Sequence, residues 1–140
     1  MKTAKDILTG LKAEGSKMTR VRAAAVEAFA RHPAPMTAQD LGASLSRAGV
    51  AVNKTTLYRE IAFLLEKGVV AEIVFGDRTA RYELKDREHH HHVVCVRCES
   101  VVDVDLDEDL EAQAKIIARK TKFTVLRHSL EFFGLCASCK

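Results

Sequence analysis

The sequence has no run of about 18 consecutive apolar residues, so we expect no membrane-spanning helix. Its first residues, MKTAKDILTGLK, lack the long apolar core of a secretory signal, and this absence favours the cytoplasm. It also has no internal repeat and no low-complexity tract apart from one run of four histidines, which argues against a repeat array.

Net charge is also small. The 140 residues are 47% hydrophobic and 29% charged, as in a globular protein, and the formal net charge is only +3. The charge is uneven, because residues 1–83 hold 13 basic against 9 acidic side chains and residues 84–140 hold 9 against 10. A mildly basic first part permits a polyanionic partner without demonstrating one. The length suits one domain or two very small ones.

The four cysteines form two Cys-x-x-Cys pairs separated by 37 residues: Cys95 with Cys98, and Cys136 with Cys139. In a reducing cytosol, disulfides are disfavoured, whereas thiolates suit a tetrahedral zinc ion. Four thiolates leave no open coordination position, so the predicted role is structural. Redox motifs or buried thiols are the alternatives.

The first part of the chain shows helical periodicity. A short apolar stripe precedes Gly15, and Thr19 and Thr37 stand where N-caps of two further helices are expected. Asn53 precedes another helical stretch, KTTLYREIAFLLEKG, which ends at Gly68. VVAEIVF and RTARYEL then read as two strands around a Gly-Asp turn. This order predicts a winged helix-turn-helix over residues 1–83.

In a helix-turn-helix, the second helix enters the major groove and its first residues meet base edges. Hydroxyl, phenol and basic side chains are expected there and at one earlier helix start. The predicted DNA contacts are Lys17, Arg20, Arg22, Lys54, Thr55, Thr56, Tyr58 and Arg59. The alternative is a solvated polar face on a structural helix.

The second part follows a charged connector at residues 84–88. HHHHVVC and SVVDVDL read as strands, DEDLEAQAKIIARK as a helix and FTVLRHSLEFFGL as a last strand. The predicted buried face of this helix consists of Leu110, Ala114, Ile117 and Ala118. Residues 89–140 are too few to bury much surface alone, so we expect this small α/β domain to dimerise. The whole chain is predicted to be α+β.

The histidine run lies on one of these strands, where side chains alternate between faces. His90 and His92 would point one way and His89 and His91 the other, so one strand could supply two metal sites. Glu83 on the preceding strand and Asp103 on the following one are candidate partners for one pair. Glu111 on the helix and His128 on the last strand are candidate partners for the other. Such nitrogen and oxygen ligands suit iron(II), zinc, manganese, cobalt or nickel. The alternative is a solvated strand that binds metal adventitiously.

The order of these features closely resembles the ferric uptake regulator (Fur) family of bacterial metal-dependent repressors. The matching motifs, over residues 12–139, are KMTRVR, TTLYRE, ARYEL, HHHHVVCVRC and RHSLEFFGLCASC. The resemblance implies a non-enzyme that represses metal-homeostasis genes as a metal-loaded homodimer on palindromic operators. It further implies an N-terminal DNA-binding domain and a C-terminal dimerisation domain.

The resemblance also implies ligand sets. The four cysteines match the structural zinc site, and Tyr58 and Arg59 match the DNA-reading helix. The regulatory set at the hinge matches Glu83, His90, His92 and Asp103. A second set matches His89, His91, Glu111 and His128, where Glu111 requires a one-residue insertion.

One departure from the family pattern concerns the metal site at the hinge. Pro35 stands where many members supply a metal ligand from the DNA-binding domain, so His32 or Glu72 would have to replace it. No cysteine is left over for a zinc-sensing hinge, and Glu83 stands near where peroxide sensors tend to carry aspartate. Iron(II) is therefore the favoured effector, with zinc or manganese as alternatives.

Three other interpretations remain. The first is a peroxide or zinc sensor of the same family, and the second is a zinc-stapled DNA-binding dimer without a sensing role. The third is a zinc-dependent hydrolase, against which the sequence offers no HExxH motif.

Overall fold

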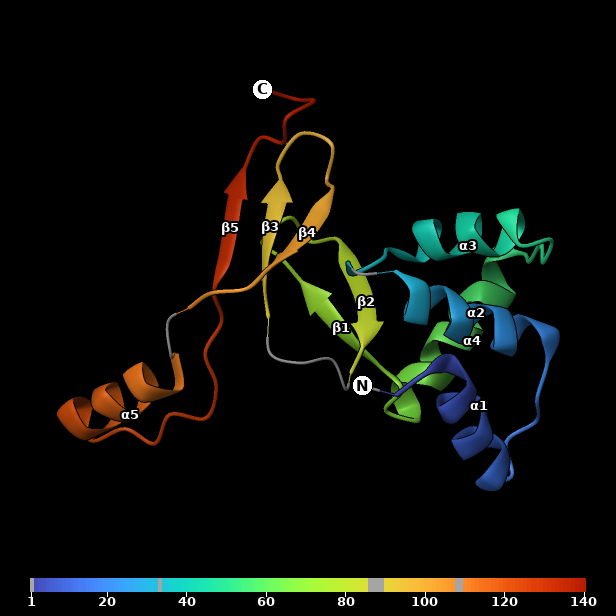
Figure 1. The fold of residues 1–140 in the computed structure, drawn as a ribbon, viewed down its shortest axis with the longest axis horizontal. Helices are drawn as coiled ribbons and strands as arrows, with labels where there is room; N and C mark the ends of the chain where they lie inside the picture. Colours follow the sequence, from blue (N-terminus) through green and yellow to red (C-terminus); the bar gives the residue numbers. More distant parts are fainter. Residues whose placement is uncertain (1, 33, 86–89, 108–109) are drawn as a thin grey trace. The chain divides into compact units, whose positions relative to one another are not determined.

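The computed structural model describes residues 2–32, 34–85, 90–107 and 110–140. The chain divides into two compact units, Met1–Glu88 and His89–Lys140, which are drawn in Figure 1. Among the described residues, no helix is both long and apolar enough to cross a membrane. Residues 86–88 of the predicted connector lie outside the described residues, and Leu84, its first residue, instead ends a strand.

Four helices open the first unit, and each begins where a polar side chain caps it. The caps are Thr3, Thr19, Thr37 and Asn53, whose side chains each accept a hydrogen bond from the backbone N–H three residues later. At Thr37 the Asp40 carboxylate completes a capping box. The helices are α1 (Ala4–Ala13), α2 (Arg20–Arg31), α3 (Ala38–Arg47) and α4 (Lys54–Glu66).

An antiparallel hairpin completes the first unit. Strands β1 (Val70–Val74) and β2 (Ala80–Leu84) pair with Val70 opposite Leu84, and Met36 adds a backbone bridge to Tyr82. Buried side chains of all four helices and of both strands form one hydrophobic core. The predicted winged helix-turn-helix is therefore present, with α4 as its second helix.

An ion pair joins Asp77 of the hairpin turn to the buried Arg81 of β2. Arg81 Nη2 lies 2.9 Å from Asp77 Oδ2, and the Arg81 side chain is only 2% exposed. Asp77 Oδ1 also accepts a hydrogen bond from the N–H of Thr79. The Arg81 guanidinium therefore lowers the pKa of Asp77 below its ordinary value.

The second unit contains a three-stranded sheet in the order β4-β3-β5. Its strands are β3 (His91–Cys95), β4 (Val101–Val104) and β5 (Glu131–Gly134), and β3 runs antiparallel to β4 and parallel to β5. The last strand is much shorter than predicted, because residues 122–130 have no regular secondary structure. The α+β class is confirmed.

The helix of this unit, α5 (Leu110–Thr121), differs from its prediction. None of its described residues is buried, and Ile117 is 52% exposed. The predicted buried face is wrong for a single chain, because none of the other helices and strands within the described ranges packs against α5. An amphipathic helix of this kind leaves its apolar stripe available to another surface.

Candidate metal centres and nucleic-acid interface

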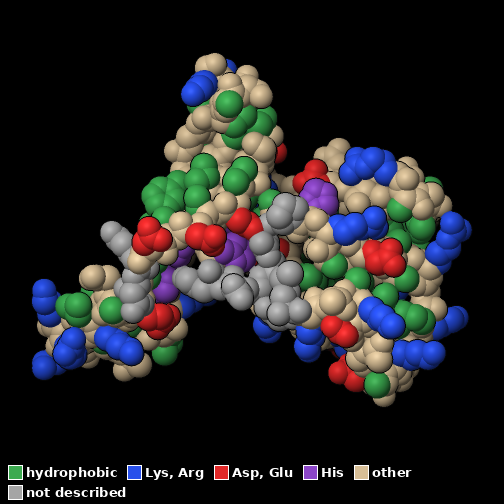
Figure 2. Space-filling view, in the orientation of Figure 1, with side chains coloured by type: hydrophobic (Ala, Val, Ile, Leu, Met, Phe, Trp, Pro, Cys, Tyr) green, Lys and Arg blue, Asp and Glu red, His purple; other side chains and the backbone are tan. Residues whose placement is uncertain are grey.

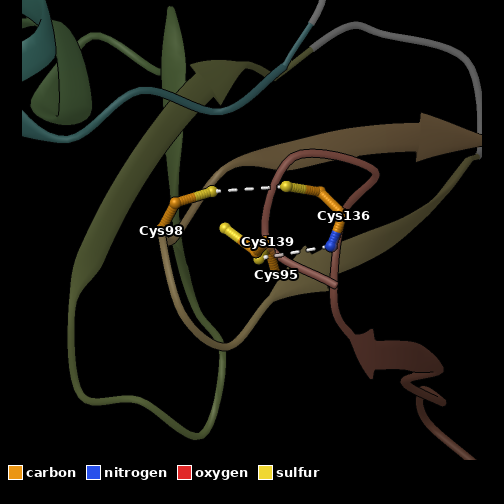
Figure 3. A group of neighbouring side chains, drawn as sticks. All are labelled: Cys95, Cys98, Cys136 and Cys139. Carbon is orange, nitrogen blue, oxygen red and sulfur yellow. Dashed lines mark hydrogen bonds between the residues drawn. The ribbon is translucent and has the colours of Figure 1, made fainter.

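Two tight turns bring the four cysteines together. Cys95 ends β3, and the Glu99 N–H returns to its carbonyl at 3.0 Å, while the Cys139 N–H bonds to the Cys136 carbonyl at 3.0 Å. Figure 3 shows the result, with Cys98 Sγ 3.8 Å from Cys136 Sγ and the Cys136 N–H donating to Cys95 Sγ. All four sulfur atoms lie within 4.8 Å of one another.

This arrangement fits a tetrahedral zinc ion. Zn–S bonds of about 2.3 Å in a tetrahedron place neighbouring sulfurs about 3.8 Å apart. Backbone N–H groups of Cys98, Cys136 and Arg97 lower the pKa of Cys95 to about 6, favouring the metal-binding thiolate. Hydrogen bonding with the Cys136 thiol raises the pKa of Cys139 to about 12. All four thiols are free.

A second cluster lies on one face of β3. The register sets His92 opposite Asp103 on β4, and His90 precedes His92 by two residues. Asp103 Oδ1 lies 3.5 Å from His92 Nε2 and 3.9 Å from His90 Nε2, and the two imidazole rings stand 4.7 Å apart at 82°. These side chains are 9–19% exposed. Two nitrogens and one carboxylate oxygen thus converge in a nearly buried place, which suits a divalent first-row metal.

The opposite face of β3 carries His91. Its Nδ1 lies 3.3 Å from the Leu130 carbonyl oxygen, and its ring centre lies 6.2 Å from that of His128. The predicted alternation of faces is therefore confirmed for His91 and His92. His128 precedes β5 and does not lie on a strand, which corrects our placement. Of the other predicted members, Glu111 is exposed in the first turn of α5, and His89 lies outside the described residues.

The hairpin register bears on the hinge ligands. Glu83 stands opposite Ala71, whereas Glu72 stands opposite Tyr82. Neighbouring strand residues alternate between faces, so Glu72 and Glu83 leave opposite faces of the hairpin. The register therefore does not favour Glu72 as a companion ligand to Glu83. Pro35 is buried, and His32 is the exposed C-cap residue of α2.

The first residues of α4 form the predicted nucleic-acid interface. Leu57 points into the core, whereas Lys54, Thr55, Tyr58 and Arg59 are exposed. Thr56 is half-buried, and Lys17 and Arg20, at the earlier helix start, are exposed.

Arg22 does not belong with these exposed side chains. Its Nε lies 2.8 Å from Glu60 Oε1, and its Nη1 donates to the Lys17 carbonyl at 2.6 Å. The structure thus uses Arg22 inside the fold, which corrects its assignment as a phosphate contact. Sequence reasoning also missed Glu60, although a carboxylate among buried leucines of one helix face was a usable signal.

The sequence profile of the ferric uptake regulator family matches residues 13–133. The chain belongs to this family. It is therefore a Fur-family, metal-responsive transcription regulator, which confirms the predicted resemblance. The family is not an enzyme family, so the hydrolase alternative is excluded.

Known relatives support this membership. The chain is 30% identical to the ferric uptake regulation protein of Neisseria gonorrhoeae over 131 residues, 93% of this chain and 90% of the relative. It is also 30% identical to the peroxide operon regulator of Bacillus subtilis over 135 residues, 96% of this chain and 92% of the relative. The Helicobacter pylori ferric uptake regulator has the same fold, with a TM-score of 0.81 at 21% identity over 99% of this chain and 94% of that one.

Proposed function

We propose that this Fur-family chain is an iron(II)-responsive repressor that binds palindromic operator DNA as a homodimer. The observation that carries the proposal is the convergence of His90, His92 and Asp103 beside a separate four-cysteine cluster. The cysteines supply a closed tetrahedral set, which suits structural zinc. The histidine cluster leaves coordination positions open, which suits an exchangeable ion.

The choice of iron(II) rests on the ligands. The histidine cluster offers imidazole nitrogens and a carboxylate but no thiolate, and thiolates are the ligands that favour zinc. Zinc and manganese remain chemically acceptable to the same atoms, since affinity alone does not select among divalent metals. Iron(II) is therefore the proposed effector, and zinc and manganese serve as comparisons in the binding experiment.

Glu83 is the proposed fourth ligand. It lies on β2 of the DNA-binding unit, so a shared ion would tie that unit to the histidines of the second unit. A bound ion can favour the DNA-binding conformation of the dimer only by as much as it binds this conformation more tightly than the alternative conformation. His32 is the remaining candidate for an extra ligand. We propose a second site formed by His89, His91, Glu111 and His128, which would bind metal within the dimerisation unit.

The proposed DNA contacts are exposed side chains of α4 and of the earlier helix start, together with the half-buried Thr56. Tyr58 and Arg59 would read bases, with Arg59 suited to guanine, and basic side chains would neutralise phosphates. The supporting residues are Lys17, Arg20, Lys54, Thr55 and Thr56. Two such helices in a dimer would enter successive major grooves of a palindrome. Because the proposed partner is chromosomal DNA, we propose a cytoplasmic location.

Exposed apolar side chains support the homodimer. Figure 2 shows hydrophobic side chains at the surface over the strands of the second unit. In this unit Leu126 is 89% exposed and Phe123 74%, in addition to Ile117 on α5. Large exposed apolar patches mark protein–protein contact surfaces. A second copy is the partner proposed for this surface.

Peroxide sensing is the second candidate function, favoured by the 30% identity to a peroxide operon regulator. It would use the same histidine cluster with iron(II) bound. Mass spectrometry of the iron-loaded protein after peroxide exposure tests it. Oxidation confined to His90 or His92 would support peroxide sensing, whereas unmodified histidines after full loss of operator binding would contradict it.

The main experiment measures operator affinity of the full chain with no added metal and with iron(II), manganese or zinc. Iron(II) should tighten operator binding, and His90→Ala should abolish this effect of iron(II). The matched control is Asp105→Asn, which changes an exposed carboxylate outside both proposed ligand sets. Equal affinity under all conditions would leave a DNA-binding dimer without a sensing role. A purification free of chelators and nickel resin is required.

A further inference from the structure

The apolar stripe of α4 contains one carboxylate. Leu57, Ile61 and Leu64 are buried along this face, and Glu60 lies among them with 8% of its surface exposed. Burying a carboxylate costs free energy unless a charged group and hydrogen bonds compensate it. A residue of this type at position 60 therefore requires a partner from another element.

That partner is Arg22, in the first turn of α2. Arg22 Nε donates to Glu60 Oε1 at 2.8 Å, and Arg22 Nη2 donates to Glu60 Oε2 at 3.3 Å. This two-point contact matches the fork of a guanidinium to the two oxygens of a carboxylate. The guanidinium carbon also lies 3.4 Å from the centre of the Phe63 ring, three residues further along α4. Two side chains of α4 thus hold Arg22.

The same guanidinium also holds the chain just before α2. Arg22 Nη1 donates to the Lys17 carbonyl at 2.6 Å, and the Arg22 backbone N–H donates to Thr19 Oγ1 at 3.1 Å. Arg20 Nη2 adds a bond to the Gly49 carbonyl at 3.3 Å. One partly buried side chain therefore connects the segment that presents Lys17 and Arg20 to the helix that presents Tyr58 and Arg59.

We propose that the Arg22–Glu60 pair is a positioning device for DNA recognition. It sets the basic segment 17–20 relative to the start of α4, so that phosphate contacts and base contacts meet one duplex in register. The inference rests on the proposed DNA binding by α4. Arg22 and Glu60 act through their neighbours and do not contact DNA.

Positioning and simple charge attraction predict effects of opposite sign. Removing a carboxylate near a DNA-binding surface should tighten binding if only Coulomb attraction to phosphates matters. Removing Glu60 should weaken specific binding if its role is to hold Arg22 and thereby the segment 17–20. Glu66→Gln is the matched control, because Glu66 is an exposed carboxylate on the same helix.

The experiment uses the full metal-loaded chain carrying Glu60→Gln, at a temperature where circular dichroism shows it folded. We expect about tenfold weaker operator affinity, similar to the effect of one mismatched base pair. The slope of log affinity against log salt should become shallower by about 0.9 for each phosphate that the variant no longer neutralises. Affinity for random duplex should fall less than operator affinity, because only the operator requires base contacts and phosphate contacts in one register. A folded Glu60→Gln that binds the operator as tightly as the parent, or tighter, overturns the proposal.

Two further variants keep the outcome decisive. Arg59→Ala leaves the pair intact, so parental operator affinity in Arg59→Ala would overturn DNA recognition by α4 and this inference with it. A loss of affinity in Arg59→Ala without a loss in Glu60→Gln would overturn only the positioning role. If Glu60→Gln does not fold, Arg22→Lys replaces it, because lysine keeps the charge but cannot span both Glu60 and the Lys17 carbonyl. Parental operator affinity in Arg22→Lys overturns the proposal.

Discussion

Cys98 Sγ lies 3.8 Å from Cys136 Sγ, although 37 residues separate the two in sequence. The contact joins the turn after β3 to the turn after β5, and Arg97 strengthens it by donating to the Cys139 carbonyl at 2.6 Å. A metal ion at this junction would hold the end of the chain against the central strand of the sheet. Binding free energy at such a site is folding free energy.

Cys95→Ser should therefore destabilise the second unit and weaken the dimer. The variant should bind less zinc, and the parent protein should show the same loss of structure after prolonged chelation. Metal analysis, thermal unfolding and sedimentation measure the three effects. The control is Ser138→Ala, which changes an exposed residue within the same turn. A Cys95→Ser protein that stays dimeric and equally heat-stable would contradict a structural metal.

Asp103→Asn should weaken binding of the regulatory metal without removing zinc from the cysteines. The Asp103 carboxylate lies within 4 Å of both His90 and His92, so its loss removes one ligand and one negative charge from the cluster. The affinity for iron(II) should fall at least tenfold, as measured by anaerobic titration calorimetry. Asp105→Asn, two residues further on and exposed, is the control. Unchanged iron(II) affinity would exclude Asp103 as a ligand.

Arg59→Ala should weaken operator binding without changing metal content. The Arg59 side chain is exposed on α4, so its removal leaves the core intact. If it contacts guanine, the loss should be about 1–3 kcal/mol and confined to one base position. Binding assays on operators with single base changes measure this specificity. A uniform loss across all sequences would instead assign Arg59 to a phosphate.

Asp77→Asn should destabilise the first unit in a pH-dependent way. The Arg81 guanidinium lowers the pKa of Asp77 from its ordinary value of 3.8. A carboxyl whose pKa is depressed by folding contributes stability above its unfolded pKa, and this stability is lost as the pH falls through the folded pKa. The melting temperature of Asp77→Asn should therefore lie below that of the parent at pH 7. The two should converge as the pH falls below about 4. A difference that persists unchanged at low pH would exclude the ion pair as its cause.

Much of the fold could be predicted because its signals are local. Thr19, Thr37 and Asn53 cap helices through hydrogen bonds that span three residues, and the strand period alone separates His91 from His92. The cysteine cluster was also predictable, because paired Cys-x-x-Cys spacing suits one tetrahedral ion. The sequence by itself therefore determined the element order, the family and the cysteine cluster.

Tertiary structure decided the partners of charged and apolar side chains. Arg22 carries the same charge as its exposed neighbour Arg20, and only the packing of α2 against α4 turns Arg22 inward to Glu60, 38 residues away. The register of the hairpin, which depends on how two strands pair, separated Glu72 from Glu83. The apolar stripe of α5 was readable, but its burial depends on a surface that one chain does not supply. Periodicity in the sequence indicates which side chains share a face, whereas only the packing of the folded chain determines what that face contacts.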